Sequence, residues 1–284
     1  MNADIVARGR VAVVTGAASG IGAAAARRFA REGMRLVLFD RDEKRLRVLA
    51  GALDTEVVVM AGDVSREADL EALREAAYEQ FGEVALLMNN AAIIERAGPY
   101  EKVEAWRHAL DVNFFGPLAA QHLFVPRMME AKTRSAIVNL GSKEGITTPP
   151  GKAAYSVSKA AVKVLTEQLS HELLKATGGR VTAHLLVPGY TWTPMNFPGL
   201  KPLQDVKPEE PWTAEQVIDL FVERFRRGDF YIICPDNSVT SEMDARRIRW
   251  AADDMVQNRP ALSRWHPDWG PRFAAWMSGP PEED

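Results

Sequence analysis

Residues 11–22 read VAVVTGAASGIG, a short apolar run followed by a turn with glycines at positions 16, 20 and 22. Glycine at these positions leaves room for a pyrophosphate to approach the backbone. A helix that starts there presents free N–H groups and the positive end of its dipole. We interpret the turn as a dinucleotide-binding loop in which Gly16, Ser19, Gly20, Ile21 and Gly22 lie against the cofactor. An ordinary strand-to-helix turn is the alternative interpretation.

Short β-rich apolar runs alternate with longer helical patterns on the C-terminal side of this turn. The runs predict strands at residues 10–14, 35–39, 56–60, 84–88, 135–140, 180–187 and 230–234. The patterns between them predict helices at residues 21–32, 43–53, 66–80, 103–131, 155–176 and 213–227. Alternation of this kind builds βαβ units with right-handed crossovers. The sequence therefore predicts an α/β fold, a doubly wound, seven-stranded parallel Rossmann sheet with helices on both faces, within a single domain at residues 1–234.

The composition argues against several classes of function. The 284 residues carry a net charge of −3 with both signs interspersed, so we expect no nucleic-acid partner. The single cysteine, Cys234, allows no intramolecular disulfide, and the scattered histidines show no pair at metal-ligand spacing, so we expect no metal site. No apolar stretch reaches the roughly 18 residues of a membrane helix, and residues 1–9 hold no apolar signal core. We expect a soluble cytoplasmic protein.

Carboxylate and amide side chains follow the predicted strands, at the sheet edge where ligands of such folds bind. Asp40 stands 18 residues after Gly22, near the spacing of about 20 at which an acidic residue binds the adenine ribose. Asp40 would repel a 2′-phosphate, which favours NAD, whereas Arg41 would hold that phosphate, which favours NADP. NAD is the preferred prediction because the glycine turn carries no basic residue. A plain helix N-cap is the alternative role for Asp40. Further cofactor-binding candidates follow the third and fourth strands: Asp63, Val64, Asn90 and Ala91.

Tyr155 and Lys159 are one helical turn apart, and Ser142 lies 13 residues before Tyr155, just after an apolar run. Tyrosine is a poor base, with a pKa of about 10 in water. A lysine four residues later on the same helix face places a positive charge beside the phenol and favours the phenolate. Lowering the pKa of the tyrosine by roughly 3 units requires about 4 kcal/mol, which Lys159 and a bound cationic cofactor would have to supply together. We therefore predict acid–base chemistry by this pair, next to a bound dinucleotide. A surface pair on a helix is the alternative.

In this order and spacing the motifs resemble the short-chain dehydrogenase/reductase family, in its single-domain branch. The resemblance covers residues 8–234. It rests on Thr15-Gly16, Gly20, Gly22, Asp63, Asn89-Asn90-Ala91, Asn113, Ser142, Tyr155, Lys159, Pro188-Gly189 and Thr193. The family usually carries glycine where this chain has Ala92, and serine where it has Gly141.

The resemblance implies a role for each matching residue of the centre. Tyr155 would exchange the proton of the substrate hydroxyl, and Lys159 would lower the pKa of Tyr155 and hold the nicotinamide ribose. Ser142 would donate a hydrogen bond to the substrate oxygen and stabilise its developing charge. Asn113 would hold a water in a proton relay that links Lys159 to solvent. Three residues after the sixth strand would secure the nicotinamide: Pro188, Gly189 and Thr193.

Three features lie outside the usual pattern or leave alternatives open. Glu144 either recognises a polar or cationic substrate group or pairs with Lys143 or Lys152 at the rim, and we favour the rim. The irregular insert at 194–212 is the expected substrate loop, and its flanking aromatic residues indicate either an apolar or aromatic substrate or a simple anchor for the loop. The extension at 235–284 predicts one helix at 241–256 and then an irregular, tryptophan-rich segment. It either covers a substrate cleft or enlarges a subunit contact, and we favour the contact.

The primary functional hypothesis is an NAD-dependent oxidoreductase that interconverts a secondary alcohol and a ketone. An NADP-dependent carbonyl reductase acting on oxoacyl or steroid-like ketones is the second hypothesis. A non-catalytic dinucleotide-sensing protein is the third, and the complete set of Asn113, Ser142, Tyr155 and Lys159 argues against it. The long helices at 103–131 and 155–176 resemble those that join subunits in the family, so a homodimer or homotetramer is expected.

Overall fold

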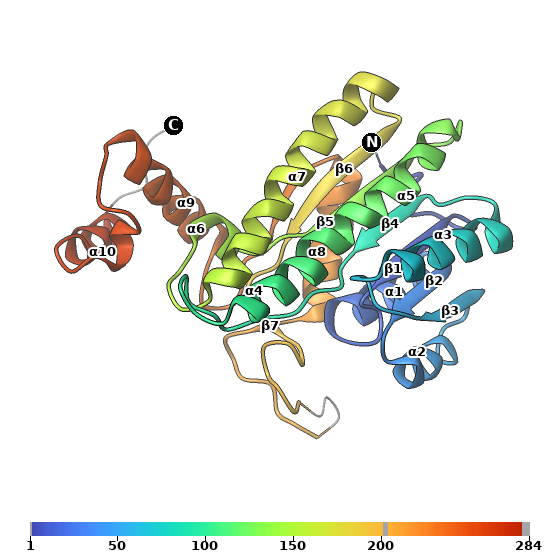
Figure 1. Cartoon of the computed structure of the whole chain (residues 1–284), viewed down its shortest axis with the longest axis horizontal. Coiled ribbons are helices and arrows are strands. Elements are labelled where there is room, and N and C mark those ends of the chain that lie inside the picture. The colour runs from blue at the N-terminus through green and yellow to red at the C-terminus, as the bar shows by residue number, and fades with distance from the viewer. Residues whose placement is uncertain (1, 201–203, 280–284) are drawn as a thin grey trace.

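The computed structural model describes residues 2–200 and 204–279. Its centre is a seven-stranded parallel sheet with strand order β3-β2-β1-β4-β5-β6-β9 (Figure 1). The strands are β1 (Val11–Thr15), β2 (Arg35–Asp40), β3 (Val57–Ala61), β4 (Leu86–Asn89), β5 (Ser135–Leu140), β6 (Val181–Val187) and β9 (Tyr231–Ile233). The order reverses between β1 and β4, so the crevice at which such sheets bind ligands lies at their carboxyl ends. The predicted fold class is confirmed.

Helices cover both faces of the sheet and bury it (Figure 1). One face packs against α1 (Gly20–Arg31), α2 (Glu43–Ala50) and α8 (Ala214–Arg227), which contribute Phe29, Leu46 and Phe221 to the core. The other packs against α3 (Glu67–Phe81), α5 (Gly116–Glu130) and α7 (Ala153–Thr177). Because both faces are covered, the strands are continuous apolar runs rather than alternating ones.

The long helix predicted at 103–131 is present but is interrupted by a π-helical turn. It consists of α4 (Val103–Leu110), a π-helical turn at Asp111–Phe115 and α5. A π turn inserts an extra residue and shifts the backbone carbonyls out of α-helical register, which is frequent at functional sites. Asn113 lies within this turn.

Several short elements were not predicted. A four-residue helix, α6 (Glu144–Thr147), follows β5, and a two-stranded parallel ladder of β7 (Thr191–Trp192) and β8 (Trp212–Thr213) closes the base of the insert. The insert between them projects from the body of the molecule (Figure 1). Its residues 201–203 lie outside the described residues.

The C-terminal extension forms helices beside the main body (Figure 1). The predicted helix at 241–256 is present as α9 (Ser241–Val256), which contacts α6. The prediction of an irregular segment after it is wrong, because η2 (Ser263–Trp265) and α10 (Gly270–Ser278) are helical. The buried Trp250 ring packs against Trp269 and Trp276, whereas Trp265 is exposed. Residues 280–284 lie outside the described residues. No helix in the described part of the chain combines the length and apolar character needed to span a bilayer.

Candidate active site

A cavity of about 460 Å³ lies at the carboxyl ends of the central strands. Most of the predicted site residues line it, although they come from segments far apart in the sequence. Those that do are Gly16, Ser19, Gly20, Ile21, Asp40, Asn90, Ala91, Ser142, Tyr155, Lys159, Pro188, Gly189 and Thr193. The fold therefore joins the predicted cofactor residues and the predicted acid–base residues in one cavity.

The glycine turn is held close to the loop after β4. Thr15 Oγ1 accepts hydrogen bonds from the backbone N–H groups of Asn90 and Ala91, each at 3.1 Å. Gly16 has a φ of +65°, and a Cβ there would lie 2.7 Å from the Cα of Ala91. A Cβ on Gly22 would lie 2.2 Å from the Gly16 carbonyl oxygen, so Gly22 serves turn packing and does not face the cavity.

The start of α1 fits an anionic group. Ser19, at its N-cap, makes no side-chain hydrogen bond to the helix, and the first turn holds no acidic residue. The first N–H groups of a helix have no partner within it. They therefore remain available to a phosphate, and the helix dipole favours the negative charge. The glycine turn and this helix start are suited to a dinucleotide pyrophosphate.

Asp40 ends β2 beside the turn, and its carboxylate accepts N–H bonds from Ala18 at 3.0 Å and from Asp42 at 3.1 Å. The N-cap alternative for Asp40 is wrong, because Asp42 caps α2. An adjoining recess of about 90 Å³ is lined by Asp40, Arg41, Asp63 and Val64, among others. Arg41 lies 3.6 Å from Asp63 in an ion pair. Burial raises the pKa of Asp63, but hydrogen bonds from Ser65 and the charge of Arg41 outweigh it and lower that pKa.

Buried amides anchor the helix that carries Tyr155 and Lys159. Asn89 Nδ2 donates to Asn139 Oδ1, and Asn139 Nδ2 donates to Thr166 Oγ1, both at 2.9 Å. This chain of bonds joins β4, β5 and α7. Asn113 makes a second connection, because its Nδ2 donates to Ser158 Oγ at 3.0 Å and its side chain also bonds both backbone groups of Ile93. Asn113 is fully buried and does not line the cavity.

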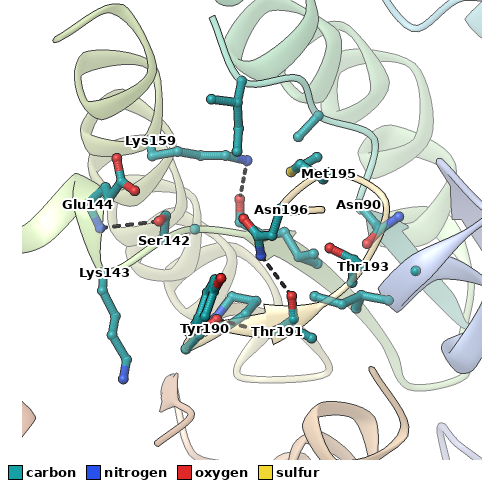
Figure 2. A pocket seen from close by; sticks show the side chains of 18 of the residues that line it. Asn90, Ser142, Lys143, Glu144, Lys159, Tyr190, Thr191, Thr193, Met195 and Asn196 are labelled. Atoms are coloured by element: carbon teal, nitrogen blue, oxygen red, sulfur yellow. Dashed lines mark hydrogen bonds between the residues drawn. The ribbon is translucent and has the colours of Figure 1, made fainter. Parts of the chain in front are cut away.

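Tyr155, Ser142 and Lys159 meet where β5 ends and α7 begins. Burial raises the pKa of Tyr155 to about 12, a hydrogen bond with Ser142 lowers it in part, and the charge of Glu144 raises it. Burial also lowers the pKa of Lys159 to about 8. The ammonium group of Lys159 lies 5.9 Å from the Tyr155 ring centroid and donates to the Leu140 carbonyl at 2.9 Å (Figure 2).

This arrangement agrees with the expectation that Lys159 needs a bound cationic cofactor beside it to activate the phenol. The cost of burying the phenolate exceeds the help from its neighbours, so Tyr155 is a protonated phenol at neutral pH in the structure. In that state Tyr155 is suited to donate a proton. Accepting one requires further positive charge in the cavity.

Glu144 and Lys143 point in different directions from the stretch after β5 (Figure 2). Glu144 Oε1 is 2.7 Å from Lys152 Nζ, which matches the predicted rim pairing with Lys152 and not the one with Lys143. Lys143 instead pairs with Asp244 of α9 at 2.6 Å. The aromatic residues that flank the insert anchor it, because the Trp192 ring lies 4.2 Å from that of Phe197 and Trp212 Nε1 donates to Asn237 at 3.1 Å.

Comparison with known proteins assigns the family. The model of the short chain dehydrogenase family matches residues 10–200. The chain belongs to the short-chain dehydrogenase/reductase family. One similar protein is the 1-deoxy-11-beta-hydroxypentalenate dehydrogenase of Streptomyces exfoliatus, which is 33% identical over 253 residues, covering 87% of this chain and 88% of that protein.

Two similar solved structures contain cofactors. A short-chain dehydrogenase/reductase from Burkholderia phymatum in complex with NAD superposes with a TM-score of 0.79 at 32% identity, covering 89% of this chain and 96% of that one. A short-chain dehydrogenase from Sphingobium yanoikuyae in complex with NADPH gives 0.70 at 28% identity, covering 88% and 93%. This short-chain dehydrogenase/reductase is therefore an NAD(P)-linked oxidoreductase acting on CH–OH groups.

Sequence reasoning missed part of the cavity wall of this short-chain dehydrogenase/reductase. Met195 and Asn196 come from the insert, and Asp236, Val239 and Arg247 come from the extension. The resemblance ends near residue 234, so no family motif marks these positions. The helix at 241–256 that carries Arg247 was predicted, but its place against the cavity was not.

Proposed function

We propose that this protein is an NAD-dependent oxidoreductase that interconverts a secondary alcohol and a ketone, with Tyr155 as the acid–base group. The observation that carries this proposal is the position of Tyr155 and Ser142 in one cavity with the glycine turn and Asp40. The nicotinamide cofactor, when bound, supplies or accepts the hydride.

The residues of the chain would handle the proton and the substrate oxygen. In ketone reduction, the protonated Tyr155 hydroxyl donates its proton to the substrate oxygen while Ser142 Oγ donates a hydrogen bond that stabilises the developing charge. Ser142 Oγ is oriented by the Glu144 N–H, which donates to it at 3.1 Å (Figure 2). In alcohol oxidation the proton moves the other way, to a Tyr155 phenolate favoured by positive charge.

Asn113 and Lys159 would support the proton path. Lys159 is buried, and among the described residues its ammonium group donates to the Leu140 carbonyl alone. Its remaining N–H groups can therefore serve the ribose and the phenol. The side chain of Asn113 is used in structural bonds. The relay that we propose would therefore place its water at backbone carbonyls of the π-helical turn, and the Asn113 side chain would fix that turn.

Asp40 supports NAD over NADP. Its carboxylate lines both the main cavity and the adjoining recess, where it would accept hydrogen bonds from ribose hydroxyls and repel a phosphate. Arg41, the residue that favours NADP, is paired with Asp63. Pro188, Gly189 and Thr193 would hold the nicotinamide end, and Asp63 and Val64 the adenine end.

The test is cofactor reduction by the purified protein across aliphatic, aromatic, steroid and sugar-derived secondary alcohols, each with NAD and with NADP. We expect NADH formation confined to one class of alcohol and a higher kcat/KM with NAD. A preference for NADP would favour the carbonyl-reductase alternative. Tight NAD binding without turnover of any alcohol, or of the matching ketones with NADH, would contradict the proposal and favour a sensing role.

A further inference from the structure

One arginine of the C-terminal extension reaches the same cavity as the acid–base residues. Arg247 of α9 lines the main cavity together with Ser142 and Tyr155. It also lines an adjoining recess of about 40 Å³ with Lys143, Asp244 and Arg264. The recess and the main cavity share Lys143 and Arg247, so charge placed there acts on whatever occupies the main cavity.

The carboxylates of this wall are already engaged. Asp244 Oδ2 lies 2.6 Å from Lys143 Nζ, and Asp236 Oδ2 lies 3.6 Å from the same nitrogen. Asp236 also accepts backbone N–H bonds from Tyr190, Ser238 and Val239. The two carboxylates more than offset the charge of Lys143, and with Arg247 and Arg264 the five groups of this wall carry one net positive charge when all are ionised. Asp236 also fixes the loops around Lys143.

The two arginines make no direct ion pair among the described residues, although the charge of Arg247 acts on Asp244 and helps to hold down the pKa of that carboxyl against the effect of burial. Within residues 2–200 and 204–279, neither Arg247 nor Arg264 forms an ion pair, and Arg247 Nε is a buried donor with no acceptor. Arg264 stacks over Trp265 and Phe273, with its guanidinium carbon 4.7 and 4.9 Å from the ring centroids. Burial lowers the pKa of Arg264, and the nearby charge of Arg247 lowers it further. An anion between them would relieve this repulsion.

We infer that Arg247, assisted by Arg264, binds a carboxylate that the alcohol or ketone substrate carries away from its reacting carbon. Guanidinium groups bind carboxylates through paired, charge-assisted N–H···O bonds. Glu144 is close enough to Tyr155 to raise the pKa of that phenol, and it would repel an anion near the reacting oxygen. The substrate carboxylate therefore belongs on the extension side of the cavity. The inference rests on the proposed function for the identity of the ligand, but not for the existence of the anion site.

Binding is tested first, without turnover. Benzoate and benzamide have the same shape and differ in charge, and calorimetric titration of the NADH-loaded protein measures both. We expect benzoate to bind about ten- to a hundredfold more tightly than benzamide, the range expected for charge-assisted hydrogen bonds. Arg247→Gln should remove this difference, and Arg247→Lys should retain part of it. Arg249→Gln removes the same charge from an exposed position on the same helix outside both cavities and should retain all of it.

Reduction by NADH is tested second, with 4-acetylbenzoate and its uncharged methyl ester. We expect the wild-type protein to prefer the acid mainly through a lower KM. Arg247→Gln should lose this preference, whereas Arg249→Gln should keep it and leave the kinetics with both ketones unchanged. Reduction of both ketones without a preference would overturn the anion site and leave the proposed oxidoreductase in place.

The remaining outcomes separate the two proposals. Benzoate binding that depends on Arg247, in a protein that reduces neither ketone and oxidises no alcohol, would support the anion site and contradict the proposed function. Equal affinities for benzoate and benzamide would overturn the site. A loss of NADH affinity in Arg247→Gln would also overturn it, because the arginine would then serve a cofactor phosphate.

Discussion

Burial moves the pKa values of Tyr155 and Lys159 away from those of free side chains, and in opposite directions. It raises the pKa of Tyr155 to about 12 and lowers that of Lys159 to about 8. Both shifts favour the neutral form, because the surroundings solvate charge poorly. The positive charge of Lys159, which the chemistry needs, therefore lowers the free energy of unfolding.

The cost at Lys159 predicts a pH-dependent stability. Between pH 8 and 10.5 the unfolded chain keeps a proton on this lysine that the folded chain has lost, so the lysine's contribution to stability rises with pH in that window. Relative to Lys159→Met, the free energy of unfolding of the wild type should therefore improve by about 3 kcal/mol between pH 7 and pH 10.5. Urea denaturation of both proteins at each pH measures this difference. A constant difference would show that Lys159 is not buried as described.

Asp40 is expected to set the cofactor preference. Asp40→Ala removes the charge that would repel a 2′-phosphate, since like charges brought together cost several kcal/mol. The ratio of kcat/KM for NAD to that for NADP should fall at least about tenfold, mainly through better use of NADP. Arg41→Ala is the matched control, and under this account it leaves the ratio in favour of NAD. If Asp40→Ala leaves the ratio unchanged, cofactor selection lies elsewhere.

At the scale of elements, the amide chain through Asn139 links the sheet to the helix that carries Tyr155. Replacing Asn139 by Leu removes the hydrogen bonds that the buried side chains of Asn89 and Thr166 make to it. We expect a loss of about 2–4 kcal/mol in the free energy of unfolding and a lower kcat, because α7 is no longer fixed against β5. Chemical denaturation and steady-state kinetics measure the two effects. Unchanged stability would exclude this network as the anchor of α7.

The sequence predicted the regular elements better than the short ones. The β5 strand has the predicted bounds because a strand buried on both faces is an uninterrupted apolar run. The β7–β8 ladder has two residues in each strand, too few for any periodicity. The helix α10 left a signal that was missed, since Trp269, Phe273 and Trp276 recur at the spacing of one helix face. The π-helical turn at Asp111–Phe115 could not be predicted, because the pattern of apolar residues does not distinguish it from α-helix.

At the scale of the whole molecule, the cavity joins residues that no single motif contains. The family pattern predicted the residues from the glycine turn to Thr193, because most of them follow strands at one sheet edge and Tyr155 and Lys159 lie in the first turns of α7 beside that edge. Arg247 and Asp236 could not be predicted, because their places depend on how the extension folds back against α6. Substrate selection would therefore depend on the part of the chain that the resemblance does not cover.

Exposed apolar side chains on the face formed by the π-helical turn and α7 predict subunit association. Phe115 and Val164 are 51% and 52% exposed. We expect light scattering to report the mass of a dimer or tetramer, and Val164→Asp to reduce it. Val206→Asp, at a 90% exposed position on the insert, is the control and should leave the mass unchanged. A monomeric wild type would contradict this expectation.

The central claim is that Tyr155 transfers the substrate proton in an NAD-linked reaction. The most direct measurement compares NADH formation by the wild type and Tyr155→Phe, using the best alcohol of the panel, with NAD affinity measured on both proteins. The account predicts a fall in kcat of about 10²–10⁴ in the variant with NAD affinity retained, because only the hydroxyl is removed. Turnover by Tyr155→Phe at the wild-type rate would contradict it.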